Sequence, residues 1–66
     1  MIYAEKIRRL RGISKSQLAR STATNQATMS RLLNERIPMS PTYTQRLAAA
    51  LGIDPARVAE QVTGDE

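Results

Sequence analysis

The segment from residue 15 to residue 36 constrains the fold most strongly, because its pattern is typical of two short helices joined by a tight turn. Leu18 and Ala19 lie on the inner side of the first helix of this pair. In the second helix, apolar residues recur at positions i, i+3 and i+4, which forms one apolar stripe of an α-helix. These residues are Met29, Leu32 and Leu33. The segment therefore predicts a pair of helices that each bury one face.

The turn and the outer face of the second helix have a different composition. Residues 21–25 are poor helix formers or natural caps, and Thr24 or Asn25 can accept hydrogen bonds from the first turn of the second helix. The outer face carries hydrogen-bonding side chains and one small one, with no carboxylate before Glu35. Its residues are Gln26, Ala27, Ser30, Arg31 and Asn34. A polar, donor-rich face without acids suits a DNA major groove.

The basic residues are concentrated in one half of the chain. Residues 1–36 hold eight basic and two acidic side chains, whereas residues 37–66 hold two basic and four acidic ones. The net charge of +4 is therefore the balance of a cationic first half and a slightly anionic second half. This asymmetry indicates that the first half faces a polyanion. A charged surface that serves only solubility is the alternative interpretation.

Length and composition exclude several classes of protein. A chain of 66 residues allows one domain, expected over residues 1–66 with a frayed tail at 62–66. Cysteine and histidine are absent, which removes disulfides, thiolate zinc sites and histidine-based catalysis. No nucleophile has a base beside it, so we expect no enzyme, no metal and no cofactor. No apolar run approaches the ~18 residues of a membrane span, and we expect a cytoplasmic protein.

Helix signals also precede the central pair. A first helix is expected over residues 2–11, with Tyr3, Ile7 and Leu10 as its inward stripe. Gly12 can adopt the left-handed conformation that ends a helix. The cationic side chains around this stripe would then surround the end of the first helix.

Further capping signals complete the chain. Ser14 and Gln17 have the spacing of a capping box at the start of the central pair. Two cap residues followed by proline predict helices over residues 41–51 and residues 55–62, and Gly52 ends the former. The sequence thus predicts an all-α fold, a compact bundle of five short helices.

These motifs resemble those of the phage-repressor-like (lambda repressor, Cro, Xre) helix-turn-helix proteins, over roughly residues 7–59. The residues that carry the resemblance are Ile13, Ser14, Leu18, Ala19, Thr24, Gln26, Met29, Leu32, Asn34, Leu47, Ala48, Leu51, Gly52 and Ile53. The resemblance implies a helix-turn-helix at residues 15–34 in a lambda-repressor-like fold. It also implies a bacterial or phage regulator, most simply a repressor, that binds a palindromic operator in double-stranded DNA as a homodimer. Such a protein is associated with the nucleoid when it is bound to DNA.

Two turn residues differ from the pattern of this family. Ala23 stands where glycine is usual, so a left-handed backbone there would cost roughly 1 kcal/mol. Thr22 occupies a position that is usually aliphatic, which should weaken the packing of the two helices. The link between the helix expected over residues 2–11 and the helix that begins at residue 15 is also shorter than is common in this family.

The resemblance assigns base reading to the second helix of the motif, at Gln26, Ala27 and Arg31, with Ser30 as a further candidate. Glutamine can pair with adenine N6 and N7, and arginine with guanine O6 and N7. The methyl group of Ala27 can meet a thymine methyl group. For Arg31, a contact to phosphate is an alternative that remains open.

Phosphate contacts are assigned by the same resemblance, with one residue added by proximity only. They are Lys15, Asn34, Thr42 and Tyr43, and the added residue is Arg36. A solvated Lys15 and a core Tyr43 remain alternative interpretations. On charge alone, the first helix contributes three further candidates, Arg8, Arg9 and Arg11.

Self-association and other partners leave several alternatives. Ile53, Val58 and Val62 are the candidate dimer contacts, although both valines could instead close the monomer core. A protein-binding module, either an antitoxin or an adaptor, is the main rival function. The polar outer face argues against it, because interface cores favour large apolar and aromatic anchors. RNA binding is disfavoured because Tyr3 and Tyr43 are the only aromatic residues.

Overall fold

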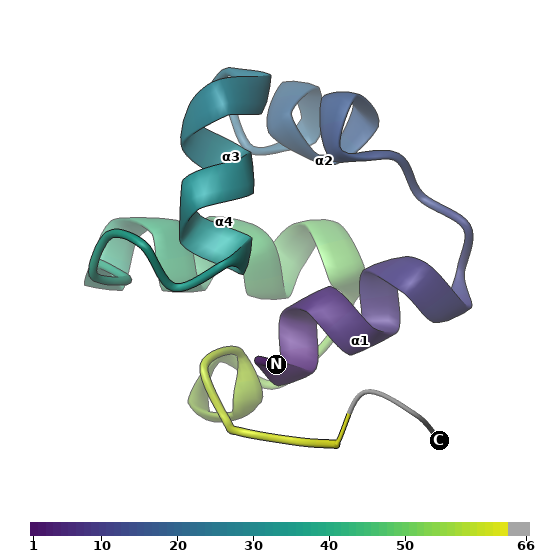
Figure 1. Ribbon diagram of the computed structural model, residues 1–66, viewed down its shortest axis with the longest axis vertical. Coiled ribbons are helices and arrows are strands. Elements are labelled where there is room, and N and C mark those ends of the chain that lie inside the picture. Colours follow the sequence, from purple (N-terminus) through teal and green to yellow (C-terminus); the bar gives the residue numbers. More distant parts are fainter. Residues whose placement is uncertain (64–66) are drawn as a thin grey trace.

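The computed structural model describes residues 1–63, and within them it contains helices, connecting segments and one isolated bridge between Ile2 and Gln61. The expected all-α fold is confirmed (Figure 1). The elements are α1 (Tyr3–Leu10), α2 (Lys15–Ser21), α3 (Gln26–Leu33), α4 (Pro41–Leu51) and a short 3-10 helix, η1 (Pro55–Arg57).

The helices pack around a single apolar core. α2 packs against α3, α1 and η1 pack against α4, and α2 also contacts α4. In Figure 1, α2 and α3 form the upper part of the molecule, whereas α1 and η1 form the lower part. Large apolar side chains from α2, α3, α4 and the residue after η1 are almost completely buried: Leu18, Met29, Leu32, Leu47, Leu51 and Val58. Because α4 contacts both α1 and α2, it joins the two parts of the fold.

Side-chain caps begin three of the four α-helices. The hydroxyl of Ser14 accepts from the N–H of Gln17, whose side chain accepts from the N–H of Ser14, so the predicted capping box is confirmed. Of the two candidates for the start of α3, Asn25 is the cap. Ser40 caps α4 as expected. These three caps fix the starts of α2, α3 and α4 where the sequence placed them.

The start of α1 is stabilised differently, because Ile2 precedes it and has no side chain that could cap it. The N–H of Tyr3 donates to the carbonyl of Glu60 at 2.8 Å, and the N–H of Ala4 donates to the carbonyl of Val58 at 3.2 Å. Carbonyl groups near the C-terminal end thus satisfy N–H groups that the first turn of a helix leaves unpaired.

This pairing explains why the expected fifth helix over residues 55–62 is wrong beyond Arg57. Residues 58–62, which we call the C-terminal strap, form a turn and then an extended segment beside the N-terminus. In a helix that continued to residue 62, the carbonyl of Val58 would have accepted from the N–H of Val62 and would not have been available to α1. The N–H of Val62 donates to the carbonyl of Met1 at 2.9 Å, so the chain is still held at residue 62. The remainder of the expected tail, residues 64–66, lies outside the described residues.

The inward face of α1 also differs from the expected stripe. Leu10 is 66% exposed, and Tyr3 and Ile7 are only partly buried. The buried residues of this helix are Ala4 and Glu5. The helix is therefore rotated relative to the prediction, because the strap fixes its first turn and a carboxylate is satisfied internally.

That carboxylate belongs to Glu5, whose side chain is 2% exposed. Arg8 donates to it through Nε and Nη2, the latter at 3.2 Å, and Nη2 of Arg9 lies 3.4 Å from Oε2. Arg8 also donates to the carbonyl of Ile13 at 2.7 Å. A buried charge is tolerated when it is paired and hydrogen-bonded in this way.

The four α-helices end in the same manner, each followed by a residue with a left-handed backbone. These residues are Gly12, Ala23, Glu35 and Gly52, with φ between 57° and 67°. In each case the next residue donates its N–H to the carbonyl five positions earlier, as in a Schellman motif. The left-handed backbone considered at Ala23 is confirmed, and Glu35 repeats it without glycine. The two residues that bear this strain follow α2 and α3.

Candidate nucleic-acid interface

The outer face of α3 is open to solvent. Its apolar stripe, Met29, Leu32 and Leu33, is buried, with no side chain of the three more than 2% exposed. On the opposite side, Ser30 is half-buried and the other residues are exposed: Gln26, Ala27, Arg31 and Asn34. The structure therefore brings all four candidate base readers and Asn34 to one face.

The N-terminal end of α2 is joined to this face through Ser30. Nζ of Lys15 lies 3.4 Å from Oγ of Ser30, and Nδ2 of Asn34 lies 3.4 Å from the same oxygen. Lys15 comes from the first turn of α2, whereas Ser30 and Asn34 are one turn apart on α3. Two candidate phosphate residues thus converge on one candidate base reader, a connection that the sequence pattern did not predict.

The turn between α2 and α3 is fixed by backbone and side-chain bonds. Thr22 is buried, and its hydroxyl donates to the carbonyls of Leu18 at 2.8 Å and Ala19 at 3.2 Å. Nη1 of Arg46 donates to the carbonyl of Thr22 at 3.4 Å and so joins α4 to the turn. The threonine at this usually aliphatic position therefore has its polar group satisfied, and the turn is held from two sides.

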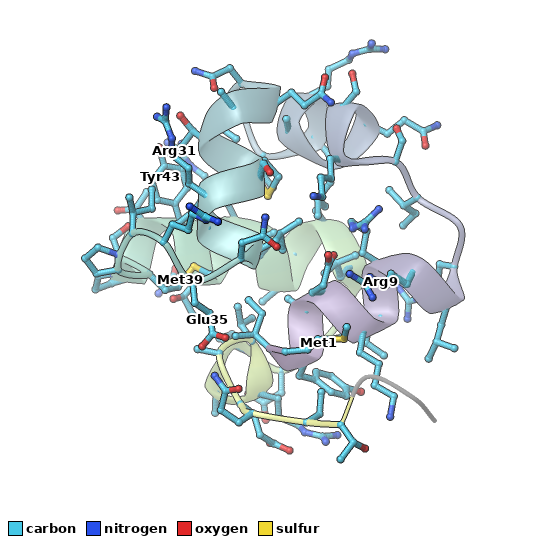
Figure 2. The ribbon with its side chains drawn as sticks, viewed as in Figure 1. Met1, Arg9, Arg31, Glu35, Met39 and Tyr43 are labelled. Carbon is cyan, nitrogen blue, oxygen red and sulfur yellow. The ribbon has the colours of Figure 1, made fainter. Side chains whose placement is uncertain are left out.

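The start of α4 places two further candidates at different depths. Thr42 is exposed, and with Pro41, Gln45 and Arg46 it lines a shallow hollow of about 310 Å³. Tyr43 is half-buried and packs against the core, as the core interpretation of this aromatic requires. In Figure 2, Tyr43 and Arg31 lie on the same side of the molecule.

The acidic and basic side chains are distributed unevenly around this surface. Between residues 6 and 53, Glu35 is the only carboxylate. Its Oε1 accepts a hydrogen bond from Nε2 of Gln61, which holds it toward the C-terminal strap. Four arginines on α2, α3, the segment after α3 and α4 are exposed: Arg20, Arg31, Arg36 and Arg46. An exposed cationic surface with one carboxylate engaged elsewhere favours binding of an anion.

The arginines of α1 and its C-terminal cap each make a contact within the protein, which argues against their use as DNA contacts but leaves that candidate role a prediction. Arg8 is 13% exposed and binds Glu5, and Arg9 shares that carboxylate. Nη1 of Arg11 donates to the carbonyl of Leu51. In Figure 2, Arg9 lies on the opposite side of the view from Arg31. The spacing of Glu5 to Arg8 and Arg9, i to i+3 and i+4, was the sequence signal for this pairing.

The candidate dimer contacts are separated by burial. Val58 is fully buried, so the alternative that it closes the monomer core is the correct one, and it is unavailable as a dimer contact in this structure. Ile53 and Val62 are half-buried. Of the three, these two retain some apolar surface for another chain.

An exposed ion pair lies beside the strap. Arg57 donates to Glu60 through Nε at 3.1 Å and Nη2 at 3.2 Å, and its guanidinium lies 4.0 Å from the centre of the Tyr3 ring. The hydrogen bond from Arg57 holds the pKa of Glu60 below its usual value, and the same bond raises the pKa of Arg57. This cation is therefore engaged by the protein and not directed toward α3.

Two further features, a cluster of metal-ligating side chains and a helix that could span a membrane, are absent from the described part of the chain. Residues 1–63 contain no group of three or more acidic, cysteine or histidine residues placed to hold a metal ion. No helix among them is long and apolar enough to cross a membrane.

Comparison with known proteins agrees with the expected motif. A family model described as a helix-turn-helix domain matches residues 2–61, nearly the whole chain. No curated protein matches the chain, and neither does any solved structure. The match includes both helices of the predicted motif, the turn between them and α4, and it is consistent with the resemblance to Xre-like DNA-binding proteins.

Proposed function

Because the chain belongs to the helix-turn-helix domain family, whose members are DNA-binding domains, we propose that it binds double-stranded DNA sequence-specifically as a transcriptional regulator. In this proposal α3 enters the major groove. A repressor of phage or bacterial type is the simplest form of this function, since occupation of an operator can by itself block transcription. Its place of action would be the nucleoid in the bacterial cytoplasm.

One observation carries the proposal: α3 buries its apolar stripe and exposes a polar face without a carboxylate. An exposed Gln26 at the start of the helix and an exposed Arg31 further along are side chains that pair with base edges. The small Ala27 between them lets the helix approach the bases closely. An antitoxin or adaptor that used this face would need large apolar anchors, and this helix presents none there.

Phosphate contacts would position α3 in the groove. Lys15 reaches from α2 to the outer face of α3, and Asn34 is the C-cap of α3. Thr42 and Tyr43 stand in the first turn of α4, and Arg36 lies in the segment that connects α3 to α4. Contacts from these residues would fix the register of α3 along the duplex.

Dimeric binding is the part of the proposal that concerns a second copy of the chain. A homodimer on a palindromic operator would place its two half-sites about one helical turn apart. Ile53 and Val62 are the apolar residues that remain for such a contact. A chain this small has a limited core, so a partner would add to its stability.

Selection of bound sequences from a random duplex pool, at near-physiological salt, tests the proposal. We expect enrichment of one consensus, palindromic if the chain binds as a dimer. The double variant Gln26→Ala, Arg31→Ala is the matched control, because both residues are exposed and their loss leaves the core unchanged. The control should lose the preference at the base pairs that these two residues contact, and so enrich a weaker consensus. If the unaltered chain enriches nothing, the proposed function is wrong and a protein partner becomes the better interpretation.

A further inference from the structure

The hydroxyl group of Ser30 is surrounded by hydrogen-bond donors. A serine hydroxyl can accept two hydrogen bonds and donate one. Its oxygen lies 3.4 Å from the ammonium nitrogen of Lys15 and 3.4 Å from the amide nitrogen of Asn34. An ammonium group has no acceptor, so Ser30 must be the acceptor toward Lys15. The two contacts together occupy the accepting capacity of the oxygen.

The hydrogen of this hydroxyl is not used inside the described part of the protein. Other helical hydroxyls here donate to the carbonyl four residues earlier, as Ser21 does to Gln17 and Thr44 does to Ser40. Within residues 1–63, the hydroxyl of Ser30 makes no such bond, and its contacts are those in which its oxygen accepts. Its one remaining capacity is therefore to donate, from a position on the face of α3 that carries Gln26 and Arg31.

We propose that Ser30 is a specificity-determining residue that donates to a base acceptor in the major groove and cannot accept from a base. This inference rests on the proposed DNA binding and defines its chemistry at one base pair. The acceptors in the major groove are purine N7, guanine O6 and thymine O4, whereas cytosine N4 and adenine N6 are donors. Ser30 therefore favours a base pair that presents an acceptor and disfavours an amino group at the same place.

Lys15 and Asn34 act on this preference as positioning residues. By donating to Oγ, they orient the hydroxyl hydrogen away from themselves and toward the groove. If one of them is removed, a lone pair of the oxygen becomes free. The hydroxyl can then rotate and also accept from an amino group, so that discrimination at that base pair becomes weaker. A role limited to phosphate contact would change the affinity for all sequences alike.

The test is a quantitative binding profile, in which the affinity for every single-base variant of the selected operator is divided by that for the operator itself. For Ser30→Ala we expect discrimination at one base pair per half-site to fall about 5-fold, the value of one net hydrogen bond. Ser21→Ala is the matched control, because its exposed hydroxyl already donates to Gln17. The control profile should stay unchanged, and thermal denaturation should show that both variants fold.

Lys15→Met supplies the second arm, since it keeps an aliphatic side chain and removes the donor. We expect this variant to bind more nearly equally to operators that present cytosine N4 or adenine N6 at the base pair identified by Ser30→Ala. A loss of affinity shared by all sequences cancels when each affinity is divided by that for the operator. If Ser30→Ala leaves the normalised profile unchanged while the unaltered chain still selects its operator, the inference about Ser30 is wrong and the proposed function stands. If the unaltered chain binds no duplex, both are overturned.

Discussion

Helices α1 and α3 are each eight residues long and each carries arginine, but their arginines bind different groups. In α1, Arg8 and Arg9 lie one turn after Glu5 and bind its buried carboxylate. In α3 there is no acidic residue, and Arg31 is exposed without a side-chain partner in the described residues. The position of a carboxylate, rather than the number of arginines, therefore decides in which of these helices the arginines are bound within the protein.

The largest expected effect tests the internal role of the α1 arginines. Glu5→Ala should lower the free energy of unfolding by about 3 kcal/mol, because it leaves the mostly buried guanidinium of Arg8 without its counter-charge. Urea denaturation would measure the loss. Arg9→Ala is the control, since Arg9 is 56% exposed and its pair should contribute less than about 1 kcal/mol. Equal losses for the two variants would mean that burial does not distinguish these contacts.

The next effect is on binding and concerns the exposed face of α3. Gln26→Ala should weaken binding to the selected operator by about 1–3 kcal/mol and relax the preference at one base pair. The free energy of unfolding should change by no more than about 0.5 kcal/mol, because the side chain is exposed. Titrations with operator and scrambled duplexes measure this. If both duplexes lose affinity equally, Gln26 is not a base reader.

A smaller effect separates the cation beside α3 from those of α1. Lys15→Ala should weaken binding to operator and scrambled duplexes and reduce the slope of log K against log salt concentration by about one unit, apart from the change in preference at the base pair that Ser30 contacts. Arg9→Ala should leave this slope unchanged, because Arg9 binds Glu5 on another side of the molecule. Titrations at several salt concentrations give both slopes. An unchanged slope for Lys15→Ala would remove Lys15 from the phosphate contacts.

The ends of the helices extend the comparison, since the left-handed residue after α1 is Gly12, whereas the one after α2 is Ala23. Ala23→Gly should raise the free energy of unfolding by roughly 1 kcal/mol, because glycine adopts a left-handed backbone without steric cost. Gly12→Ala should lower it by a similar amount. A Cβ at residue 12 would meet no atom within 4 Å, so the cost there is that of the backbone alone. Thermal or urea denaturation should show changes of opposite sign, and the same sign for both would contradict this account.

The smallest effect concerns Arg57 and Glu60, an exposed pair with the same three-residue spacing as Glu5 and Arg8. Arg57 lowers the pKa of Glu60 in the folded state. The stability contributed by this pair is therefore present above the pKa of Glu60 in the unfolded chain, and it is lost as pH falls through the lower folded value. A carboxyl NMR titration should show the lowered pKa, and Arg57→Ala should return it to the usual range. No change in that variant would exclude the hydrogen bond as the cause.

Patterns with a local physical cause could be predicted from the sequence. The caps at Ser14 and Ser40 and the buried stripe of α3 depend on side chains within one or two turns of each other. Such interactions are visible in the spacing of residues along the chain. The orientation of α3, and with it the exposure of Gln26 and Arg31, followed from the same reasoning.

The parts that could not be predicted depend on residues far apart in the sequence. Where a helix was expected, the strap forms hydrogen bonds to α1 through the carbonyls of Val58 and Glu60, more than fifty residues away along the chain. The prediction that Leu10 faces inward was wrong for a related reason, since α1 buries Glu5 and thereby turns Leu10 toward solvent. The contact of Lys15 with Ser30 joins two helices and has no signature within either one.

The bond between Val62 and Met1 has a practical consequence, since it places the two ends of the described chain next to each other. A short flexible linker between them should give a circular chain with the same fold. New ends could then be opened in the segment between α3 and α4. The permuted protein would show whether α2 and α3 pack together when the order of the elements along the chain is changed.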